Sequence, residues 1–409
     1  MRNTNTKPAL RFSEFKEDWK PVKLNEVFKR KSIKNKGSIV KSVLTNSATQ
    51  GVILQNDFFD KEIANQNNLE GYYIVEIDDF VYNPRISKSA RVGPLKRNNL
   101  SIGVMSPLYT VLKNLKGDLG FFEYFFETKY WHKYMKGIAN YGVRHDRMNI
   151  TNDGFENLPI PYPVIEEQTK IASFLVTIDQ RISQLTEKKQ QLEIYKKGIT
   201  QKIFSQQLRF KDENGKVFPK WEKKKFDSIF KRVSTKNIED NQNVLTISAQ
   251  HGLINQQDYF NKSVSANDVT GYYLIKKGDF AYNKSYSKGY PMGAIKCLTK
   301  YEKGVVSTLY ICFNIKDKSN ENFYEHFFES GMLNKQIHKI AQEGARNHGL
   351  LNMSVIEFFK DIDVFKPVIQ EQKKIANFLN AISEQIQKVS EQLEATKIFK
   401  KGLLQQMFV

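Results

Sequence analysis

The 409-residue sequence has little cysteine and no long hydrophobic run. Its two cysteines, Cys297 and Cys312, both lie in the second half of the chain, which argues against a disulfide framework and against a cysteine zinc cluster. No apolar stretch approaches the roughly 18 residues of a membrane span. Residues 1–7 are polar and lack the apolar stretch of a signal peptide. These absences predict a soluble, cytoplasmic globular protein with no membrane partner.

Catalytic and cofactor-binding motifs are also missing. The sequence has no phosphate-cradling Gly-rich loop with a lysine, no HxxxH or CxxC ligand pair, and no G-x-G-x-x-G segment opening a helix after a strand. Residues 83–85, Asn-Pro-Arg, have a faint likeness to the Asn-Pro-Pro-aromatic motif of DNA amino-methyltransferases, but they lack its second proline and its aromatic residue. The six histidines are scattered along the chain. We therefore expect no catalytic residue, no metal site and no cofactor in this chain.

The sequence does contain an internal repeat of one unit. Residues 163–175 return as 367–379 after an interval of 204 residues, with ten of thirteen positions identical. The register then holds without a gap, so that 196–204 corresponds to 400–408. Self-similarity across half of a chain indicates a tandem duplication, and we expect a pseudo-two-fold internal repeat.

The repeated segments predict two long helices. Apolar residues recur in both segments at alternating spacings of four and three, which is typical of a coiled coil. Two such stripes in one chain favour an antiparallel pair, although packing of each helix on its own domain remains an alternative. The predicted seam residues are Ile171, Leu175, Ile178, Ile182, Leu185 and Leu192 in the first helix, and Ile375, Leu379, Ile382, Ile386, Val389 and Leu393 in the second.

The segments ahead of the helices match each other only in short islands, such as 44–53 with 245–254. Each combines short alternating strands with an aromatic helix, at 121–136 and 323–338, whose rings are spaced for a core. The expected fold class is α+β, with two mixed α/β domains separated by two long antiparallel coiled-coil helices. The expected boundaries are 1–162 for the first domain, 163–206 for the central helix, 207–366 for the second domain and 367–409 for the C-terminal helix.

Polar and basic loops that differ between the two copies are candidates for reading DNA. Arg and Lys recognise guanine edges, Asn and Gln recognise adenine, and Ser bonds to either. Solvated turns use the same residue types, so each loop on its own fits base reading and an ordinary turn equally. Basic positions shared by both copies, Lys88 with Lys288 and Arg144 with Arg346, suit phosphate better. The predicted DNA-binding residues are Gln50, Asn83, Arg85, Ser87, Lys88, Arg144, Arg147, Asn149, Gln250, His251, Asn283, Lys284, Ser287, Lys288, Arg346, Asn347 and His348.

The formal net charge of +19 supports a polyanionic partner. Residues 1–162 contain 25 basic and 17 acidic side chains, and residues 206–363 contain 24 and 18. The excess is therefore shared by the two divergent domains, as expected if both contact double-stranded DNA.

Two variable domains alternate here with two helices that open with Pro-x-x-x-Glu-Gln-x-x-Ile-Ala-x-Phe-Leu and close with Lys-Lys-Gly. This organisation resembles the specificity (S) subunit of type I restriction–modification enzymes, and the resemblance covers the whole chain. It implies that 1–162 and 207–366 are target recognition domains, each reading one half of a bipartite DNA site. It also implies that the conserved helices set the spacer between the half-sites and dock two methyltransferase (M) subunits.

The resemblance further implies that the chemistry belongs to other subunits. S-adenosylmethionine, ATP and Mg would be bound by the M subunits and by restriction/translocase (R) subunits, and this chain would supply the DNA specificity. One alternative is a self-sufficient DNA methyltransferase or nuclease, against which the missing motifs count. Another is a coiled-coil scaffold without DNA specificity, which leaves the base-reading loops and the charge of the domains unexplained.

Overall fold

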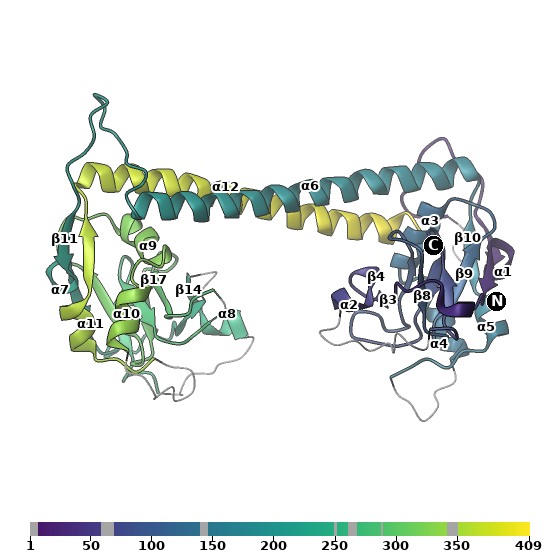
Figure 1. Cartoon of the computed structure of the whole chain (residues 1–409), viewed down its shortest axis with the longest axis horizontal. Coiled ribbons are helices and arrows are strands. Elements are labelled where there is room, and N and C mark those ends of the chain that lie inside the picture. The colour runs from purple at the N-terminus through teal and green to yellow at the C-terminus, as the bar shows by residue number, and fades with distance from the viewer. Residues whose placement is uncertain are drawn as a thin grey trace. The chain divides into compact units, whose positions relative to one another are not determined.

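The computed structural model describes residues 7–58, 69–139, 146–248, 252–260, 268–287, 289–341 and 351–409. The chain divides into two compact units. Unit 1 comprises residues 1–186 and 391–409, and unit 2 comprises residues 187–390. Each unit contains one sheet domain and parts of two long helices, α6 (Ile165–Phe204) and α12 (Ile369–Gln406), as Figure 1 shows. The predicted α+β fold class is confirmed.

The domain of unit 1 is built around a four-stranded antiparallel sheet with the order β2-β9-β6-β7. Three two-stranded antiparallel pairs, β1-β10, β3-β4 and β5-β8, accompany it. The strands are β1 (Lys20–Lys23), β2 (Phe28–Lys31), β3 (Leu44–Ser47), β4 (Gly51–Leu54), β5 (Tyr73–Val75), β6 (Phe80–Tyr82), β7 (Leu95–Arg97), β8 (Gly103–Met105), β9 (Thr110–Asn114) and β10 (Pro159–Tyr162). The helices are α1 (Leu24–Val27), α2 (Gln55–Phe58), α3 (Leu119–Glu127), α4 (His132–Ile138), α5 (Asn152–Glu156) and the 3-10 helix η1 (Lys36–Ser38).

The domain of unit 2 repeats this order, except that η1 has no counterpart among its described residues. Its four-stranded sheet is β12-β19-β16-β17, and its pairs are β11-β20, β13-β14 and β15-β18. The strands are β11 (Glu222–Lys225), β12 (Phe230–Val233), β13 (Leu245–Ser248), β14 (Gly252–Asn255), β15 (Tyr273–Lys276), β16 (Phe280–Asn283), β17 (Ala294–Cys297), β18 (Lys303–Val306), β19 (Ile311–Ile315) and β20 (Asp363–Lys366). The helices are α7 (Phe226–Ile229), α8 (Gln256–Phe260), α9 (Glu321–Glu329), α10 (Asn334–Ile340) and α11 (Val355–Asp361).

The aromatic helices α3 and α9 begin at equivalent caps and supply the rings of the two cores. Asp118 caps α3 by accepting a hydrogen bond from Phe121 N at 2.9 Å, and Asn320 caps α9 by accepting one from Phe323 N at 2.9 Å. The phenylalanines of both helices are buried against their sheets. The aromatic spacing therefore marks core, as predicted.

Each long helix contributes to both units. In unit 1, Leu175 of α6 and Leu403 near the end of α12 belong to the same hydrophobic core as the α3 rings. In unit 2, Leu379 of α12 and Ile203 near the end of α6 belong to the core that contains α9. Within each unit the start of one helix thus meets the end of the other, which is antiparallel pairing. The helix starts also pack on the domain that precedes them, so both interpretations of the apolar stripe hold in part.

The predicted seam residues differ in burial. Ile171, Leu175, Leu185, Ile375, Leu379, Ile382, Val389 and Leu393 are buried, and Ile178, Ile182, Leu192 and Ile386 are partly buried. Within the described ranges, no helix is long and apolar enough to cross a membrane.

A buried glutamate near the start of each long helix ties that helix to the chain segment ahead of the first strand. In unit 1 the Glu167 carboxylate accepts hydrogen bonds from Arg11 Nε and Nη2 at 2.7 and 2.8 Å, and from Trp19 Nε1 at 3.1 Å. Its side chain is fully buried, so the guanidinium supplies the charge that burial requires. The equivalent residues in unit 2 are Glu371, Arg209 and Trp221.

The N-terminal segment of unit 1 takes the position that the α6–β11 connection has in unit 2. Leu10 N donates to Gln406 O at 2.9 Å at the end of α12, and Leu208 N donates to Lys202 O at 3.0 Å at the end of α6. The same backbone contact is thus made once between the two ends of the chain and once within a continuous segment. In unit 1 the segment around Leu10 therefore packs on the end of α12, as the segment around Leu208 packs on the end of α6 in unit 2.

Candidate nucleic-acid interface

The predicted DNA-binding residues of unit 1 lie in three loops: the first contains Gln50, the second Asn83 to Lys88, and the third Arg147 and Asn149. Asn83, at the start of the second loop, is hydrogen-bonded to β3, the strand that precedes the first loop. Its Nδ2 donates to Asn46 O at 3.2 Å, and its Oδ1 accepts from Arg85 N at 3.0 Å. Asn46 in turn donates to Val81 O at 2.7 Å and to Pro94 O at 3.1 Å. The turn containing Gln50 follows directly on Asn46 and β3, because Gln50 N donates to Ser47 Oγ at 3.3 Å. The first two loops therefore lie together in unit 1.

The third loop pairs with the second. Arg85 and Arg147 form an antiparallel β-bridge, in which Ile86 N donates to Asp146 O at 3.0 Å. The Asp146 carboxylate lies between the two guanidinium groups, 3.9 Å from Arg85 Nε and 3.8 Å from Arg147 Nε. Three loops separated by up to 100 residues in sequence thus form one continuous surface. On it, two arginines predicted to read bases share a single counter-charge.

Ser87 and Lys88 lie at the tip of the second loop. Ser87 N donates to Ala90 O at 3.0 Å, and Ala90 N donates to Ser87 Oγ at 3.1 Å, which closes the turn and leaves Lys88 exposed. Gly93 completes the loop with φ +78°, and its Cα lies so close to Asn83 O that a Cβ would clash. The loop is therefore built by its own hydrogen bonds.

Unit 2 builds its second loop on the same backbone scheme. Asn283 Oδ1 accepts from Ser285 N at 3.0 Å, and Leu351 N donates to Lys284 O at 3.0 Å, just as Met148 N donates to Pro84 O in unit 1. Burial lowers the pKa of Lys284. The surface that carries the predicted residues is thus repeated, while its side chains differ.

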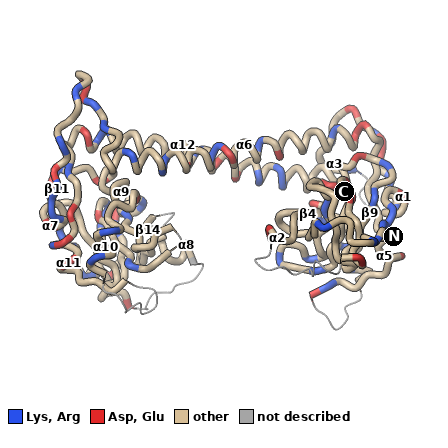
Figure 2. The backbone as a smooth tube through the Cα atoms, viewed as in Figure 1, with Lys and Arg blue, Asp and Glu red and all other residues tan. Residues whose placement is uncertain are grey.

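The predicted DNA-binding residues are not all in the described part of the chain. Those outside it are Arg144, Gln250, His251, Lys288, Arg346, Asn347 and His348. Gln50, Arg85, Ser87, Lys88 and Asn149 are exposed, whereas Asn83, Arg147, Asn283, Lys284 and Ser287 are partly buried. Lys and Arg positions are spread through strands, helices and loops of both units, as Figure 2 shows.

Two residues that the sequence did not single out help to hold the loops. Asn46 is 3% exposed, and Ile247 stands at the corresponding place in the second copy. Tyr290 closes the second loop of unit 2 by a bridge with Ser287, and its hydroxyl donates to Glu329 Oε2 at 2.9 Å. Ala90 is its counterpart in unit 1. In both cases the two aligned copies differ in polarity or size at that position, and this difference could have identified the residue from the sequence.

Each long helix also presents an exposed apolar pair at the same repeat position. Ile194 and Tyr195 on α6 are 64% and 51% exposed, and Ile398 and Phe399 on α12 are 71% and 53% exposed. We call these the outer apolar pairs. Isolated exposed apolar residues are common, but adjacent ones repeated after 204 residues indicate a surface that is used twice.

Within the described ranges, no three His, Cys, Asp or Glu side chains lie close enough together to hold a metal ion. Cys297 and Cys312 are both buried and unpaired, and burial raises the pKa of both thiols.

Comparison with known proteins assigns this architecture. Residues 16–194 match the family model of the type I restriction modification DNA specificity domain. The fold is similar to the crystal structure of the type I restriction–modification S subunit from M. genitalium, with a TM-score of 0.57, 15% identity, and coverage of 98% of this chain and 99% of that one.

A second similar structure comes from work on complex assembly and conformational transition of the type I R-M system. It has a TM-score of 0.55 and 12% identity, and covers 95% of this chain and 97% of that one. Residues 16–194 thus match the type I restriction modification DNA specificity domain, and the fold of the whole chain is similar to that of a type I restriction–modification S subunit.

Proposed function

We propose that this chain is the DNA-recognition subunit of a type I restriction–modification complex and that each unit reads one half of a bipartite site. The observation that carries the proposal is the repeated loop scaffold with different side chains in the two units. The backbone contacts of Asn83 and Met148 recur at Asn283 and Leu351, whereas the exposed residues between them do not. A scaffold duplicated with two different tips fits two different half-sites.

Within unit 1 the three joined loops form the reading surface. Arg85 and Arg147 belong to paired backbone segments, which brings both arginines to the same part of the surface, where a guanidinium binds a guanine edge. Lys88 at the exposed tip contacts a phosphate and positions the domain without contributing sequence preference. On DNA, the Asp146 carboxylate orients the two arginines, since it lies close to both.

The test is an exchange of residues 1–162 for the first domain of another specificity subunit. The recognised sequence should change in one half of the site and stay the same in the other, as read from methylated-base sequencing of cells that contain the complete system. The matched control exchanges residues 207–366, which should alter only the other half. Simultaneous changes in both halves after either exchange would contradict one unit per half-site.

The outer apolar pairs support docking of two methyltransferase subunits. Because Ile194–Tyr195 and Ile398–Phe399 are equivalent in the repeat, they offer two similar faces to two copies of one partner. Changing Ile194 and Tyr195 to aspartate should leave one subunit bound, and changing all four residues should leave none, as counted by native mass spectrometry. Lys188→Gln, an exposed change on α6, is the control. Retention of both subunits by the fourfold variant would rule out these faces.

The long helices set the spacer between the half-sites. Inserting four residues near Lys188 lengthens α6 by about 6 Å, and a matching insertion near Gln392 keeps the helices paired. The spacer should grow by up to roughly two base pairs at about 3.4 Å each, with both half-sites unchanged. A folded, active variant that keeps the original spacer would show that the helices do not measure it.

The chain contributes specificity rather than chemistry. S-adenosylmethionine would be bound by the methyltransferase subunits, and ATP and Mg by restriction/translocase subunits. The purified chain alone should neither methylate nor cut DNA, and methyl transfer by the rigorously purified chain would overturn this assignment.

A further inference from the structure

Two lysines at equivalent positions of the long helices stand in opposite surroundings. Lys400, in unit 1, lies 3.1 Å from Glu127 Oε2 and 2.8 Å from Asp179 Oδ1. Burial alone lowers the pKa of Lys400, but these two carboxylates outweigh it and the pKa is raised. Lys196 is the counterpart of Lys400 in unit 2, 204 residues earlier.

Lys196 has no such counter-charge. The place of Asp179 is taken by Ser383, and Glu329, the counterpart of Glu127, is bonded to Lys296 and to Tyr290. Across the described ranges, Lys196 makes neither a hydrogen bond nor a salt bridge. Its pKa is lowered, because burial disfavours the ammonium and Lys296 adds to this, while Glu329 and Glu325 oppose it. The α6 end of unit 2 therefore partly buries a cation that no carboxylate contacts directly.

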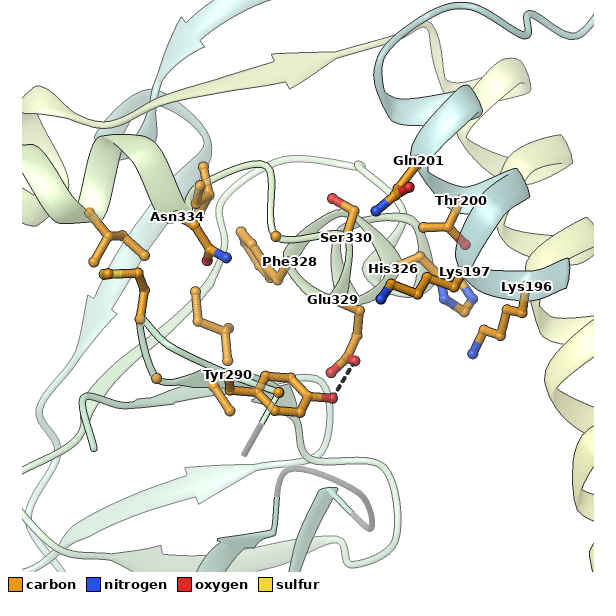
Figure 3. Close-up of a pocket in the computed structure, with 18 of the residues that line it drawn as sticks. Lys196, Lys197, Thr200, Gln201, Tyr290, His326, Phe328, Glu329, Ser330 and Asn334 are labelled. Atoms are coloured by element: carbon orange, nitrogen blue, oxygen red, sulfur yellow. Dashed lines mark hydrogen bonds between the residues drawn. The ribbon is translucent and has the colours of Figure 1, made fainter. Parts of the chain in front are cut away.

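Lys196 faces a cavity of about 530 Å³ that lies within unit 2. Its volume is in the range of small-molecule sites, roughly 300–1,000 Å³. Figure 3 shows Lys196, Lys197, Thr200 and Gln201 on α6, with Tyr290 across the cavity from them. Ser330 and Asn334 add polar groups, and Phe328 and Met292 add an apolar wall.

The repeat shows how the cavity arises. Thr200 and Leu333 line it in unit 2, where unit 1 has Leu404 and Trp131. In unit 1, Trp131 is buried in the core and Leu404 packs against it. The two copies thus fill the same place differently. In unit 1 this place is filled by the apolar side chains of Trp131 and Leu404 and by the ion pairs of Lys400. In unit 2 it is a cavity lined in part by polar groups and by Lys196 and Lys197.

We propose that this cavity, the α6–α9 cavity, binds a phosphate-bearing anion, with Lys196 and Lys197 as its cations. A phosphate would supply the negative charge that Asp179 supplies to Lys400, and it would remove the cost of a half-buried, unpaired ammonium. Lys296 and Tyr290 offset the charge of Glu329, and Glu193, the other carboxylate of the lining, is exposed to solvent. Thr200 and Gln201 donate further hydrogen bonds from the same face of α6.

Two kinds of ligand carry such a phosphate group: a small nucleotide and the DNA backbone. A small nucleotide would place its phosphates at the lysines and its ring along Phe328 and Met292. A DNA backbone phosphate would reach the cavity beside the second loop of unit 2, because Tyr290 belongs both to that loop and to the cavity. Only the DNA source rests on the proposed function.

The direct test uses the full chain without DNA. Inorganic phosphate, AMP and ATP are titrated separately by isothermal calorimetry into the wild type and into Lys196→Gln. If the source is a nucleotide, AMP or ATP should bind with a stoichiometry of one, and the variant should bind about tenfold more weakly or worse. The matched control is Lys401→Gln, the unit 1 counterpart of Lys197, which should bind like the wild type.

A second variant separates the cavity from surface charge. Thr200→Leu introduces the residue of the unit 1 counterpart, fills the cavity and leaves every lysine in place. It should lower the affinity about as much as Lys196→Gln, with an unfolding midpoint close to that of the wild type. Binding that survives in a folded Thr200→Leu protein would place the anion outside the cavity and overturn the proposal.

The DNA arm measures affinity for the cognate duplex against salt concentration. If the phosphate comes from the DNA backbone, no nucleotide binds, and Lys196→Gln weakens cognate and unrelated duplexes alike while lowering the salt slope by about one. The proposal fails if no probe binds and both variants bind DNA as the wild type does. The proposed function would survive that result, because the domain exchange tests it independently.

Discussion

The loops of unit 1 are tied to one another, whereas the second loop of unit 2 is tied to a core helix. In unit 1, Asp146 and the Arg85–Arg147 bridge join the second loop to the third. In unit 2, Tyr290 joins the second loop to Glu329 at the end of α9. The backbone contacts beneath are the same, so duplication has kept the support and changed how each tip is fixed.

The opposite holds at the start of each long helix, where the side chains themselves are kept. Glu167 and Glu371 are fully buried and bind the same arginine and tryptophan partners. The comparison teaches which positions serve the fold and which serve recognition. At these two places the buried polar anchors are identical between the copies, and the exposed loop tips differ.

The largest effect should come from removing those anchors. Glu371→Ala leaves Arg209 unpaired and should cost about 3–5 kcal/mol, the usual loss when one partner of a buried ion pair is removed. Glu167→Ala should cost about as much, because Arg11 is held in the same way. Urea unfolding followed by tryptophan fluorescence measures both variants.

The exposed neighbour Glu166 provides the control, and Glu166→Ala should change the free energy of unfolding by no more than about 0.5 kcal/mol. A large loss for one anchor and none for the other would break the equivalence of the two units at this site.

The fold class followed from the sequence because the repeat and the four-three spacing are local patterns. The same spacing did not reveal that α12 ends in the core of unit 1 and α6 in that of unit 2. A periodic stripe identifies the buried face of a helix but not its partner. Leu403 and Ile203 could thus be assigned to a buried face from the sequence, whereas their places in those two cores required the coordinates.

The candidate site was predictable at the level of loops. Arg85 and Arg147 were selected as polar positions that differ between copies, but their pairing depends on backbone hydrogen bonds across 62 residues of sequence. Asn46 and Tyr290 were missed because each is ordinary in its own copy. Only alignment with their counterparts, Ile247 and Ala90, shows that the residue type differs between the two copies at these positions.

A pH effect sharpens the comparison within the cores. His326 occupies the place of Tyr124, and burial lowers its pKa to about 4. As the pH falls, His326 is therefore protonated near pH 6.5 in the unfolded chain but only near pH 4 in the folded chain. The stability due to the neutral imidazole is present above pH 6.5 and is lost as the pH falls towards 4, by roughly 3 kcal/mol in total.

The measurement is the free energy of unfolding of the wild type minus that of His326→Gln, at several values between pH 7 and pH 4. The difference should shrink as the pH falls, since only the wild type carries the histidine. His132→Asn is the companion variant in unit 1, because His132 has its pKa lowered to about 4 by burial and Asn334 is its counterpart. Parallel curves for the wild type and His326→Gln would contradict a neutral buried His326.

Next in size come the residues of unit 1 that we propose to read DNA. Arg85→Ala and Arg147→Ala should each cost about 1–3 kcal/mol of cognate binding and relax the preference at one position of one half-site. Lys88→Ala is the contrast, because a phosphate contact weakens all sequences alike and lowers the salt slope by about one. If both arginine variants bind like the wild type, the reading surface lies elsewhere.

The smallest effect is expected from changing the connectivity of the chain. Leu10 N donates to the end of α12 as Leu208 N donates to the end of α6, so the repeat is already closed in space between Leu10 and α12. A permuted chain would begin at Gln206, run to Val409, continue through two added glutamines to Leu10, and end at Ser205. The two glutamines copy Gln206 and Gln207 of the link between α6 and Leu208. Gln206 has φ +63°, and its counterpart Pro8 could not adopt this value because the proline ring fixes φ at about −65°.

This permuted chain keeps every anchor in both units and replaces one short link by another of the same length. Its free energy of unfolding should differ from that of the natural chain by less than about 1 kcal/mol, since loop closure depends weakly on length. Its recognised DNA sequence should be unchanged. The control opens the chain inside α6, between Lys188 and Lys189, which interrupts a continuous helix and should destabilise the protein strongly. If the opening at Gln206 proves as harmful as the opening inside α6, the two ends of unit 1 do not reproduce the continuous segment of unit 2, and the equivalence of the two units fails at the point where their connectivity differs.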